Sequence, residues 1–156
     1  MNKPLSGMKI AVLAASGFEE NHLITMQKAL KDTGAILKVI SSDTGVIGGM
    51  SGQGWGHNHA VDAPLNTALG VDYEAVIIPG GKSSHEKLKK TAHTKRFVGS
   101  FQASQKPVIA IGDAIELLDF TGQMNNDVLS GEELSDAFMN DILADLMNNM
   151  EMDEAA

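Results

Sequence analysis

Apolar and polar positions along the chain fall into blocks that predict strands alternating with helices. Nearly continuous apolar runs, typical of strands buried on both faces of a parallel sheet, occur at residues 8–14, 75–78 and 107–111. Residues 35–40 indicate one further strand. Because strands separated by helices form βαβ units, the pattern predicts an α/β fold, a doubly wound sandwich around a mostly parallel sheet.

The first half of the chain also carries signals of one helix and one hairpin. Apolar residues recur at helical spacing ahead of Gly34, a residue type favoured just beyond a helix C-terminus; they are Leu23, Met26 and Leu30. Residues 44–62 are instead rich in glycine between short apolar pieces. Such punctuation predicts a small hairpin beside the sheet.

The second half predicts three helices. A lysine-rich segment favours one helix over roughly 83–104, and another helix is expected directly after Asp113. Ser130 and Glu133 have the spacing of a capping box and predict the approach to the last helix. The apolar stripe of that last helix comprises Leu134, Phe138, Ile142 and Leu146.

Composition narrows the chemistry that the chain can perform. Its 156 residues include no cysteine, which excludes disulfides, thiolate metal sites and a cysteine nucleophile. No apolar run reaches the ~20 residues needed to span a bilayer, and the first residues lead into a strand without an apolar leader. We therefore expect a single domain over residues 1–156, with a frayed acidic tail at 151–156, in the cytoplasm and without a membrane partner.

Charge is distributed unevenly. The net charge is −8, yet six of the 12 basic residues lie between Lys82 and Arg96. No Lys or Arg follows Lys106, whereas 12 of the 20 acidic residues lie between Asp113 and Glu154. An acidic protein with one short basic cluster is a poor match for a phosphate backbone. We expect a solvated helix face at the basic cluster and no nucleic-acid partner.

Three strand ends could hold a binding site. In an open α/β sheet, ligands bind beyond the carboxyl ends of the strands. These ends are residues 16–22, the Pro79-Gly80-Gly81 turn and the pair Gly112-Asp113. Glycines there let backbone N–H groups approach an anion or an oxyanion, but they equally serve tight turns, and the spacing alone leaves both interpretations open.

These segments, in this order, resemble the ThiJ/PfpI superfamily, which has a flavodoxin-like fold and is related to class I glutamine amidotransferases. The resemblance rests on the strand 9–13, Gly17-Phe18-Glu19-Glu20, residues 76–81 and residues 106–111. The Pro-Gly-Gly turn after one strand, combined with Lys-Pro-Val leading into the next, is its most specific part. The resemblance implies a flavodoxin-like three-layer sandwich and a homodimer or higher oligomer.

The enzymes of this superfamily place a cysteine on the sharp turn after the Lys-Pro-Val strand, and this chain departs from that pattern. The nucleophile position reads Gly112, and the glutamate that contacts the cysteine is replaced by His22, beside Glu19 and Glu20. We therefore expect no catalytic residue, no cofactor and no hydrolase, deglycase or glyoxalase activity. What remains is a vestigial pocket, which could hold a small anionic ligand, of Glu19, His22, Gly80, Gly81, Gly112 and Asp113.

A narrower resemblance covers almost the whole chain. Residues 106–114 and the helix opening at Asp136-Ala137-Phe138-Met139 resemble the C-terminal domain of large-subunit catalases, a flavodoxin-like module without haem of its own. This favours a stand-alone, non-catalytic module that works by association or by binding a small ligand. The alternative is a hydrolase or lyase of the ThiJ/PfpI class that uses Asp113 and His22, or a metal, in place of cysteine.

Two further features each have a functional and a purely structural interpretation. His57 and His59 have the spacing of two metal ligands on one strand face, but no third histidine is close in sequence. We treat them as weak metal candidates and expect no metal. Trp55 is expected to be exposed, and aromatic residues are enriched at protein interfaces, which fits self-association.

Overall fold

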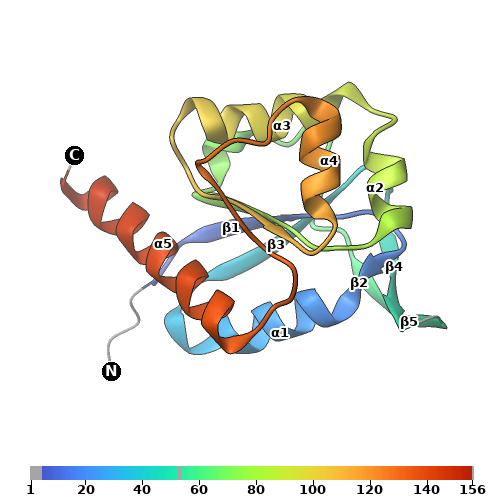
Figure 1. Cartoon of the computed structure of the whole chain (residues 1–156), viewed down its shortest axis with the longest axis horizontal. Coiled ribbons are helices and arrows are strands. Elements are labelled where there is room, and N and C mark those ends of the chain that lie inside the picture. Colours follow the sequence, from blue (N-terminus) through green and yellow to red (C-terminus); the bar gives the residue numbers. More distant parts are fainter. Residues whose placement is uncertain (1–4, 53, 156) are drawn as a thin grey trace.

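The centre of the protein is a six-stranded sheet in which every neighbouring pair of strands is parallel (Figure 1). This computed structural model describes residues 5–52 and 54–155. The strand order is β6-β3-β1-β7-β8-β9. In that order the strands span Ala63–Pro64, Ile36–Ser41, Lys9–Leu13, Ala75–Ile78, Val108–Ile111 and Val128–Gly131. The α/β, flavodoxin-like sandwich with a mostly parallel sheet is therefore confirmed.

Helices cover both faces of the sheet. In the part of the chain that the structure describes, the α-helices are α1 (Glu20–Leu30), α2 (Lys82–Leu88), α3 (Ala92–Ala103), α4 (Ala114–Thr121) and α5 (Asp136–Ala155), with 3₁₀ turns at Lys31–Thr33 and Gly70–Asp72. Figure 1 shows α1 and α5 on one face and α3 and α4 on the other. One apolar layer joins Phe97 and Leu117 to the sheet, and the other joins Met26 and Ile142 to its opposite face. The central strands β1, β7 and β8 are buried on both sides apart from Lys9 at the start of β1, as their continuous apolar runs predicted.

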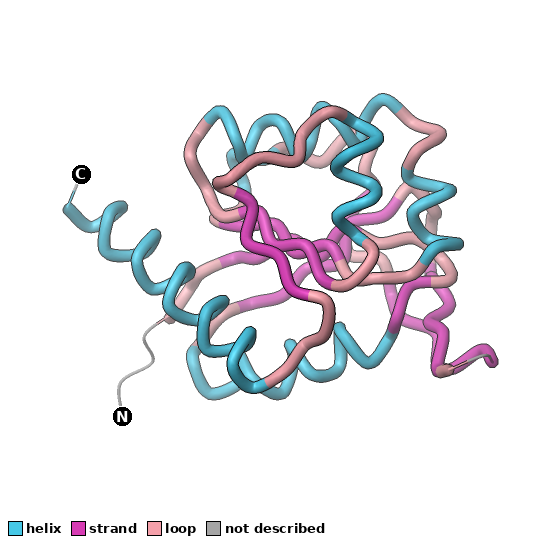
Figure 2. Tube along the Cα trace, viewed as in Figure 1, coloured by secondary structure: helices cyan, strands magenta, loops and turns pink. Residues whose placement is uncertain are grey.

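A second, three-stranded sheet lies beside the first. It consists of β2 (Phe18–Glu19), β4 (Val46–Ser51) and β5 (Gly54–Ala60), in the order β2-β4-β5. β4 and β5 pair antiparallel, which confirms the hairpin expected over residues 44–62. Figure 2 shows this hairpin at the end of the molecule away from the C-terminal end of α5. Trp55 is 68% exposed on it, as expected.

Two expectations for the helices were wrong. The lysine-rich segment 83–104 does not form one helix, because α2 ends at Leu88 and α3 starts afresh at Ala92. The new start is capped by Thr91, whose hydroxyl accepts a hydrogen bond from the backbone N–H of His93 at 3.2 Å. The chain therefore turns between two short helices over residues 89–91.

The capping box at Ser130 and Glu133 was also wrong. Ser130 lies inside β9, a short edge strand that the sequence pattern did not indicate. The hydroxyl of Ser135 instead accepts from the N–H of Phe138 at 3.2 Å, immediately before α5 begins. Ser130 and Ser135 thus both have a spacing that suits a helix cap. Because Ser130 pairs with β8 as part of β9, Ser135 takes this role.

The C-terminal end continues α5 to Ala155, while Ala156 and the side chains from Met150 onwards lie outside the described residues. The frayed tail at 151–156 and the single domain over 1–156 stay predictions. None of the helices in the described ranges is both long enough and apolar enough to cross a membrane.

Candidate functional site

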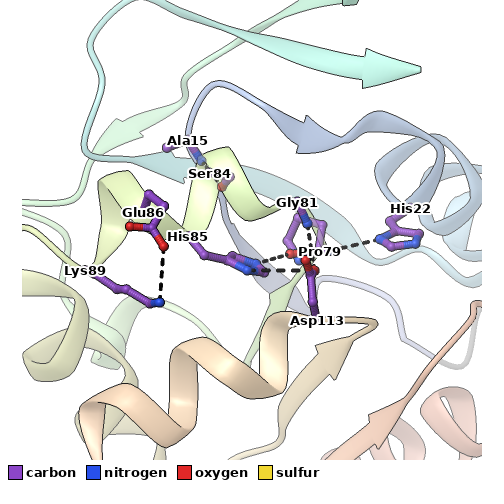
Figure 3. A network of polar contacts seen from close by, with 10 residues as sticks. Ala15, His22, Pro79, Gly81, Ser84, His85, Glu86, Lys89 and Asp113 are labelled. Atoms are coloured by element: carbon purple, nitrogen blue, oxygen red, sulfur yellow. Dashed lines mark hydrogen bonds and ion pairs between the residues drawn. The ribbon is translucent and has the colours of Figure 1, made fainter. Parts of the chain in front are cut away.

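The three strand ends singled out in the sequence meet at one edge of the sheet, here named the carboxyl edge. β1, β7 and β8 are neighbours, so the residues that follow them lie side by side. Figure 3 shows His22, Gly81, His85 and Asp113 gathered at this edge. Sequence reasoning placed His22, Gly80, Gly81, Gly112 and Asp113 in one pocket, and the structure brings these five together.

His22 is held by the Pro79-Gly80-Gly81 turn. The backbone N–H of Gly80 donates to Nδ1 of His22 at 2.9 Å, which requires that nitrogen to be unprotonated. The proton of the neutral imidazole is therefore on Nε2. Burial lowers the pKa of His22, with the Asp113 carboxylate acting against that effect and His85 adding to it.

Asp113 and His85 occupy the other side of the same turn. The N–H of Gly81 donates to Oδ1 of Asp113 at 2.9 Å. The buried His85 donates from Nε2 to the carbonyl oxygen of Pro79 at 2.9 Å, and its Nδ1 lies 3.8 Å from the same Oδ1 of Asp113. The contact becomes an ion pair when the imidazole is protonated. The two turn N–H groups that could have cradled an anion therefore already donate to side chains of the protein.

His85 is a site residue that sequence reasoning did not include. It lies in α2, and its backbone N–H donates to the carbonyl of Gly81, one helical turn earlier. The spacing between Gly81 and His85 could have indicated this position. When a helix starts at a turn glycine, the residue four positions later lies directly above that turn. Lysine and serine neighbours gave no indication that the histidine is only 3% exposed.

Gly112 has a conformation that suits a nucleophile turn, but it lacks the attacking atom. Its φ of +62° lies in the left-handed region, and its N–H donates to the carbonyl of Gly131 at 2.7 Å. A Cβ at this position would lie 3.4 Å from the carbonyl oxygen of Glu132 and 3.8 Å from Cε1 of His22. A small side chain would therefore fit beside His22, where the protein presents only hydrogen.

The two glutamates at the start of α1 have different places. Glu19 joins the carboxyl edge through its backbone, whose N–H donates to the carbonyl of Gly80 at 2.7 Å. Glu20 turns toward the β4–β5 hairpin with a side chain only 4% exposed. Oε2 of Glu20 accepts from the N–H of His57 at 2.9 Å and contacts Nε2 of His59 at 3.0 Å. The imidazole of His59, followed by the backbone of His57, lowers the pKa of Glu20.

His57 and His59 are thus joined to a buried carboxylate. Nδ1 of His57 lies 3.4 Å from Oε1 of Glu20, and the ring of His59 packs edge-on against Phe18 with centroids 5.4 Å apart. Among the side chains that the structure describes, no group of three or more His, Asp or Glu is positioned to hold a metal ion. These contacts fasten the hairpin to α1 and β2.

The space beneath the carboxyl edge is closed. The gap lined by Val12, His22, Met26 and Ile111 is too small to admit a water molecule. Gly112 and Asp113 do not line this gap and are partly exposed at the surface. Chemically, this edge offers a neutral imidazole, a carboxylate that is 41% exposed and a bare glycine turn.

Comparison with known proteins supports the first family resemblance, and the matched range includes the segments on which it rests. The DJ-1/PfpI family profile matches residues 8–140. General stress protein 18 of Bacillus subtilis is 33% identical over 113 residues, which cover 72% of this chain and 63% of that protein. Catalase HPII of Mycobacterium avium is 29% identical over 118 residues, 76% of this chain and 16% of the catalase. The chain thus matches less than two thirds of either relative's length.

Solved structures show the same architecture. The ThiJ/PfpI domain protein from Brachyspira murdochii superposes with a TM-score of 0.76 at 18% identity, covering 92% of this chain and 98% of that one. At such low identity the likeness concerns the fold, whereas the family profile covers most of the chain. On that match, this protein belongs to the DJ-1/PfpI family, and its homologues include C-terminal regions of catalases.

Proposed function

We propose that this chain is a non-catalytic member of the DJ-1/PfpI family, working as an interaction or small-ligand-binding module. The observation that carries the proposal is Gly112, a left-handed turn residue with no atom that could attack a substrate. Covalent catalysis needs a nucleophile beside a base that activates it. The chain has no cysteine anywhere that could supply one.

The neighbouring polar groups support the same proposal. The N–H groups of Gly80 and Gly81, which could stabilise an oxyanion, donate to His22 and Asp113. Oxyanion stabilisation requires donors that are free to reach the developing charge. Here both would first have to leave a partner within the protein.

A second candidate function is a hydrolase or lyase that uses Asp113 and His22. It is favoured by their closeness across Gly80, since a Cβ there would lie 3.0 Å from both Oδ1 of Asp113 and Cε1 of His22. Nδ1 of His22, however, is engaged by the Gly80 N–H, so Nε2 carries a proton and cannot act as a base without a tautomer change.

Activity assays separate the two. Purified wild type is tested with peptidase, esterase, glyoxalase and deglycase substrates beside Asp113→Asn and His22→Ala, and we expect no turnover above background in any of the three. Gly112→Cys is assayed beside them, because it returns a thiol to the turn beside His22; turnover in this variant alone would show that the missing nucleophile by itself accounts for the inactivity. Wild-type turnover that either Asp113→Asn or His22→Ala abolishes would overturn the non-catalytic proposal.

Self-association is part of the same proposal. Val46 and Trp55 are 55% and 68% exposed on the β4–β5 hairpin, where large apolar residues are left facing solvent. Aromatic residues are enriched in the centres of interfaces. We expect light scattering to give at least a dimer mass, and Trp55→Ser to shift the protein toward monomer. A monomer mass for wild type over a wide concentration range would contradict this.

A further inference from the structure

The opposite edge of the sheet, where the strands begin, carries a larger and a smaller cavity. The larger, which we name the amino-edge cavity, measures about 370 Å³ and lies between the end of α3, the starts of β8 and β9 and the second half of α5. Its lining mixes amide groups, two carboxylates and the ammonium of Lys106, so it favours neither sign of charge. The smaller measures about 260 Å³ and is lined by Lys9, Lys38, Asp62, Asp72 and Tyr73. We name it the lysine–tyrosine pocket.

A buried hydroxyl group faces the lysine–tyrosine pocket. It belongs to Tyr73, the only tyrosine of the chain, which is 9% exposed and packs edge-on against Phe97 with ring centroids 6.0 Å apart. None of the groups that the structure describes forms a hydrogen bond with this hydroxyl. Burial, followed by the charges of Asp72 and Asp62, raises the pKa of the phenol, which therefore stays a neutral donor at neutral pH. A buried donor that lacks a partner and faces a cavity indicates a ligand that accepts its hydrogen bond.

Two ammonium groups reach the same pocket from neighbouring strands. β1 and β3 pair in parallel, with Lys9 opposite Ile36 and Ala11 opposite Lys38. Because side chains along a strand alternate between the two faces of a sheet, Lys9 and Lys38 project from the same face. Neither ammonium forms an ion pair with a side chain that the structure describes. Both are therefore available to an anionic group.

Two carboxylates complete the lining. Oδ2 of Asp62 accepts from the backbone N–H of Val39 at 2.7 Å, and the N–H of Asp62 donates to the carbonyl of Val39 at 2.8 Å, which fixes Asp62 beside β3. Asp72 ends the 3₁₀ turn directly before Tyr73. Among the described side chains, neither carboxylate forms an ion pair with a lysine of the pocket. Opposite charges thus line one small pocket without pairing with each other.

A ligand with a single sign of charge would meet repulsion in this pocket. An anion would face two carboxylates and a chain with a net charge of −8, and a cation would face two ammonium groups. A zwitterion satisfies both sets of charges. The volume lies just below the roughly 300–1,000 Å³ that is usual for ligand sites, so the ligand is small, and the lining offers no further polar side chain to a polar substituent.

We propose that the lysine–tyrosine pocket binds a small aliphatic α-amino acid. Its carboxylate accepts hydrogen bonds from the two lysines and from the phenol, and its ammonium group pairs with the two aspartates. This site is separate from the carboxyl edge, because Lys9 starts β1 whereas Gly112 follows the end of β8.

The test is calorimetric titration of the full chain with L-valine at pH 7, and we expect saturable binding with one ligand per chain. Tyr73→Phe keeps the ring against Phe97 and removes only the hydroxyl, and Lys38→Met removes one ammonium group. Each should weaken binding about tenfold or more, because a hydrogen bond to a charged group is lost. Lys28→Met is the matched control, since Lys28 is an exposed lysine of α1 outside the pocket, and it should leave the affinity unchanged. Circular dichroism checks that each variant is folded.

Two analogues test on wild type itself whether both charges are needed. Isovalerate lacks the ammonium group of valine, and isobutylamine lacks its carboxylate. Each should bind at least about tenfold more weakly than L-valine. The single tyrosine supplies a second readout, because L-valine should change the near-ultraviolet absorbance of Tyr73 with the same saturation curve as the heat.

Several results would overturn the proposal. They are an absence of saturable binding, either analogue binding as tightly as L-valine, unchanged affinity in Tyr73→Phe, or an equal loss of affinity in Lys28→Met. Saturable heat without a change in the tyrosine absorbance would also contradict it, since the ligand would then bind elsewhere. The two sites lie at opposite edges of the sheet, so failure here leaves the non-catalytic proposal standing, and the reverse also holds.

Discussion

The carboxyl and amino edges of the central sheet differ in how far their polar groups are engaged in hydrogen bonds within the protein. At the carboxyl edge, the turn N–H groups of Gly80 and Gly81 are bonded to His22 and Asp113, and the gap beneath excludes water. At the amino edge, a cavity of about 370 Å³ separates the end of α3 from α5. There the side chains of Gln102 and Asn149 each donate one N–H to a backbone carbonyl, which leaves the second N–H and the amide oxygen for other partners.

The comparison separates the position of a site from its capacity to bind. A switch of strand connections brings loops together at the carboxyl edge, which explains why binding sites of such sheets usually form there. In this chain the loops do meet there, yet their side chains satisfy one another. A larger cavity lies at the other edge, between the end of α3, the starts of β8 and β9 and the second half of α5. Topology therefore identifies where residues converge, and the hydrogen-bond partners decide whether anything else can bind.

The largest expected effect comes from substituting Gly81 in the turn at the carboxyl edge. A Cβ on Gly81 would lie 2.6 Å from the carbonyl oxygen of Gly17 and 2.7 Å from Cα of Phe18, at a φ of +128°. Since both neighbours are backbone atoms, we expect Gly81→Ala to lower the free energy of unfolding by about 4 kcal/mol, an exceptional loss for one methyl group.

The matched control is Gly122→Ala at the end of α4. Gly122 has a φ of +75°, but a Cβ there meets nothing within 4 Å. Only the left-handed conformation is penalised, so a loss of about 1 kcal/mol is expected. Urea denaturation of both variants measures the difference, and similar losses would mean that the carboxyl edge is not packed as tightly as described.

The second effect concerns the helix that forms one wall of the amino-edge cavity. Leu146 is fully buried against the sheet, whereas its neighbour Met147 is 41% exposed. We expect Leu146→Ala to cost about 3 kcal/mol and Met147→Ala to change stability by less than about 0.5 kcal/mol. Thermal unfolding monitored by circular dichroism tests this pair. A loss below about 1 kcal/mol for Leu146→Ala would show that α5 is not docked there.

Much of the fold could be predicted because its central strands, β1, β7 and β8, are buried on both faces. The apolar run 75–78 coincides with β7, and the left-handed Gly34 follows the predicted first helix and its 3₁₀ extension. β9 could not be found this way, because an edge strand with residues such as the exposed Ser130 lacks a continuous apolar run. Pairing with β8, a contact remote in sequence, determines it.

The sequence indicated which backbone turns meet at the candidate site, but not which side chains pair with one another there. Chain topology placed Gly80, Gly112 and Asp113 together, since all three directly follow neighbouring strands. The partner of each group depends on side-chain direction, which spacing does not fix. Hence the burial of His85 and the turn of Glu20 toward His59 were not foreseen.

A third and smaller effect distinguishes the charge of Asp113 from its hydrogen bond. Asp113→Ala leaves the N–H of Gly81 without its acceptor, and we expect a loss of about 1.5 kcal/mol. Asp113→Asn keeps an oxygen at the same place and should cost less than half of that. Equal losses in urea denaturation would indicate that the charge beside His85 matters more than the contact with the turn.

The smallest expected effect is the pH dependence that His22 contributes. Its pKa is lowered from 6.5 by burial, so below pH 6.5 the unfolded chain binds a proton more readily than the folded one. The contribution of His22 to stability should therefore be complete above pH 6.5 and decline as the pH falls toward its lowered pKa. His22→Asn keeps an acceptor for the Gly80 N–H and removes the titration, while Asp113 and His85, which face His22, remain in place. Urea denaturation from pH 7.5 to pH 5 measures both proteins. Wild type should lose stability relative to this variant as the pH falls. A stability difference that does not change with pH would mean that the imidazole of His22 is not desolvated. If wild type instead gains stability relative to the variant as the pH falls, the attraction of Asp113 for the protonated imidazole outweighs the effect of burial.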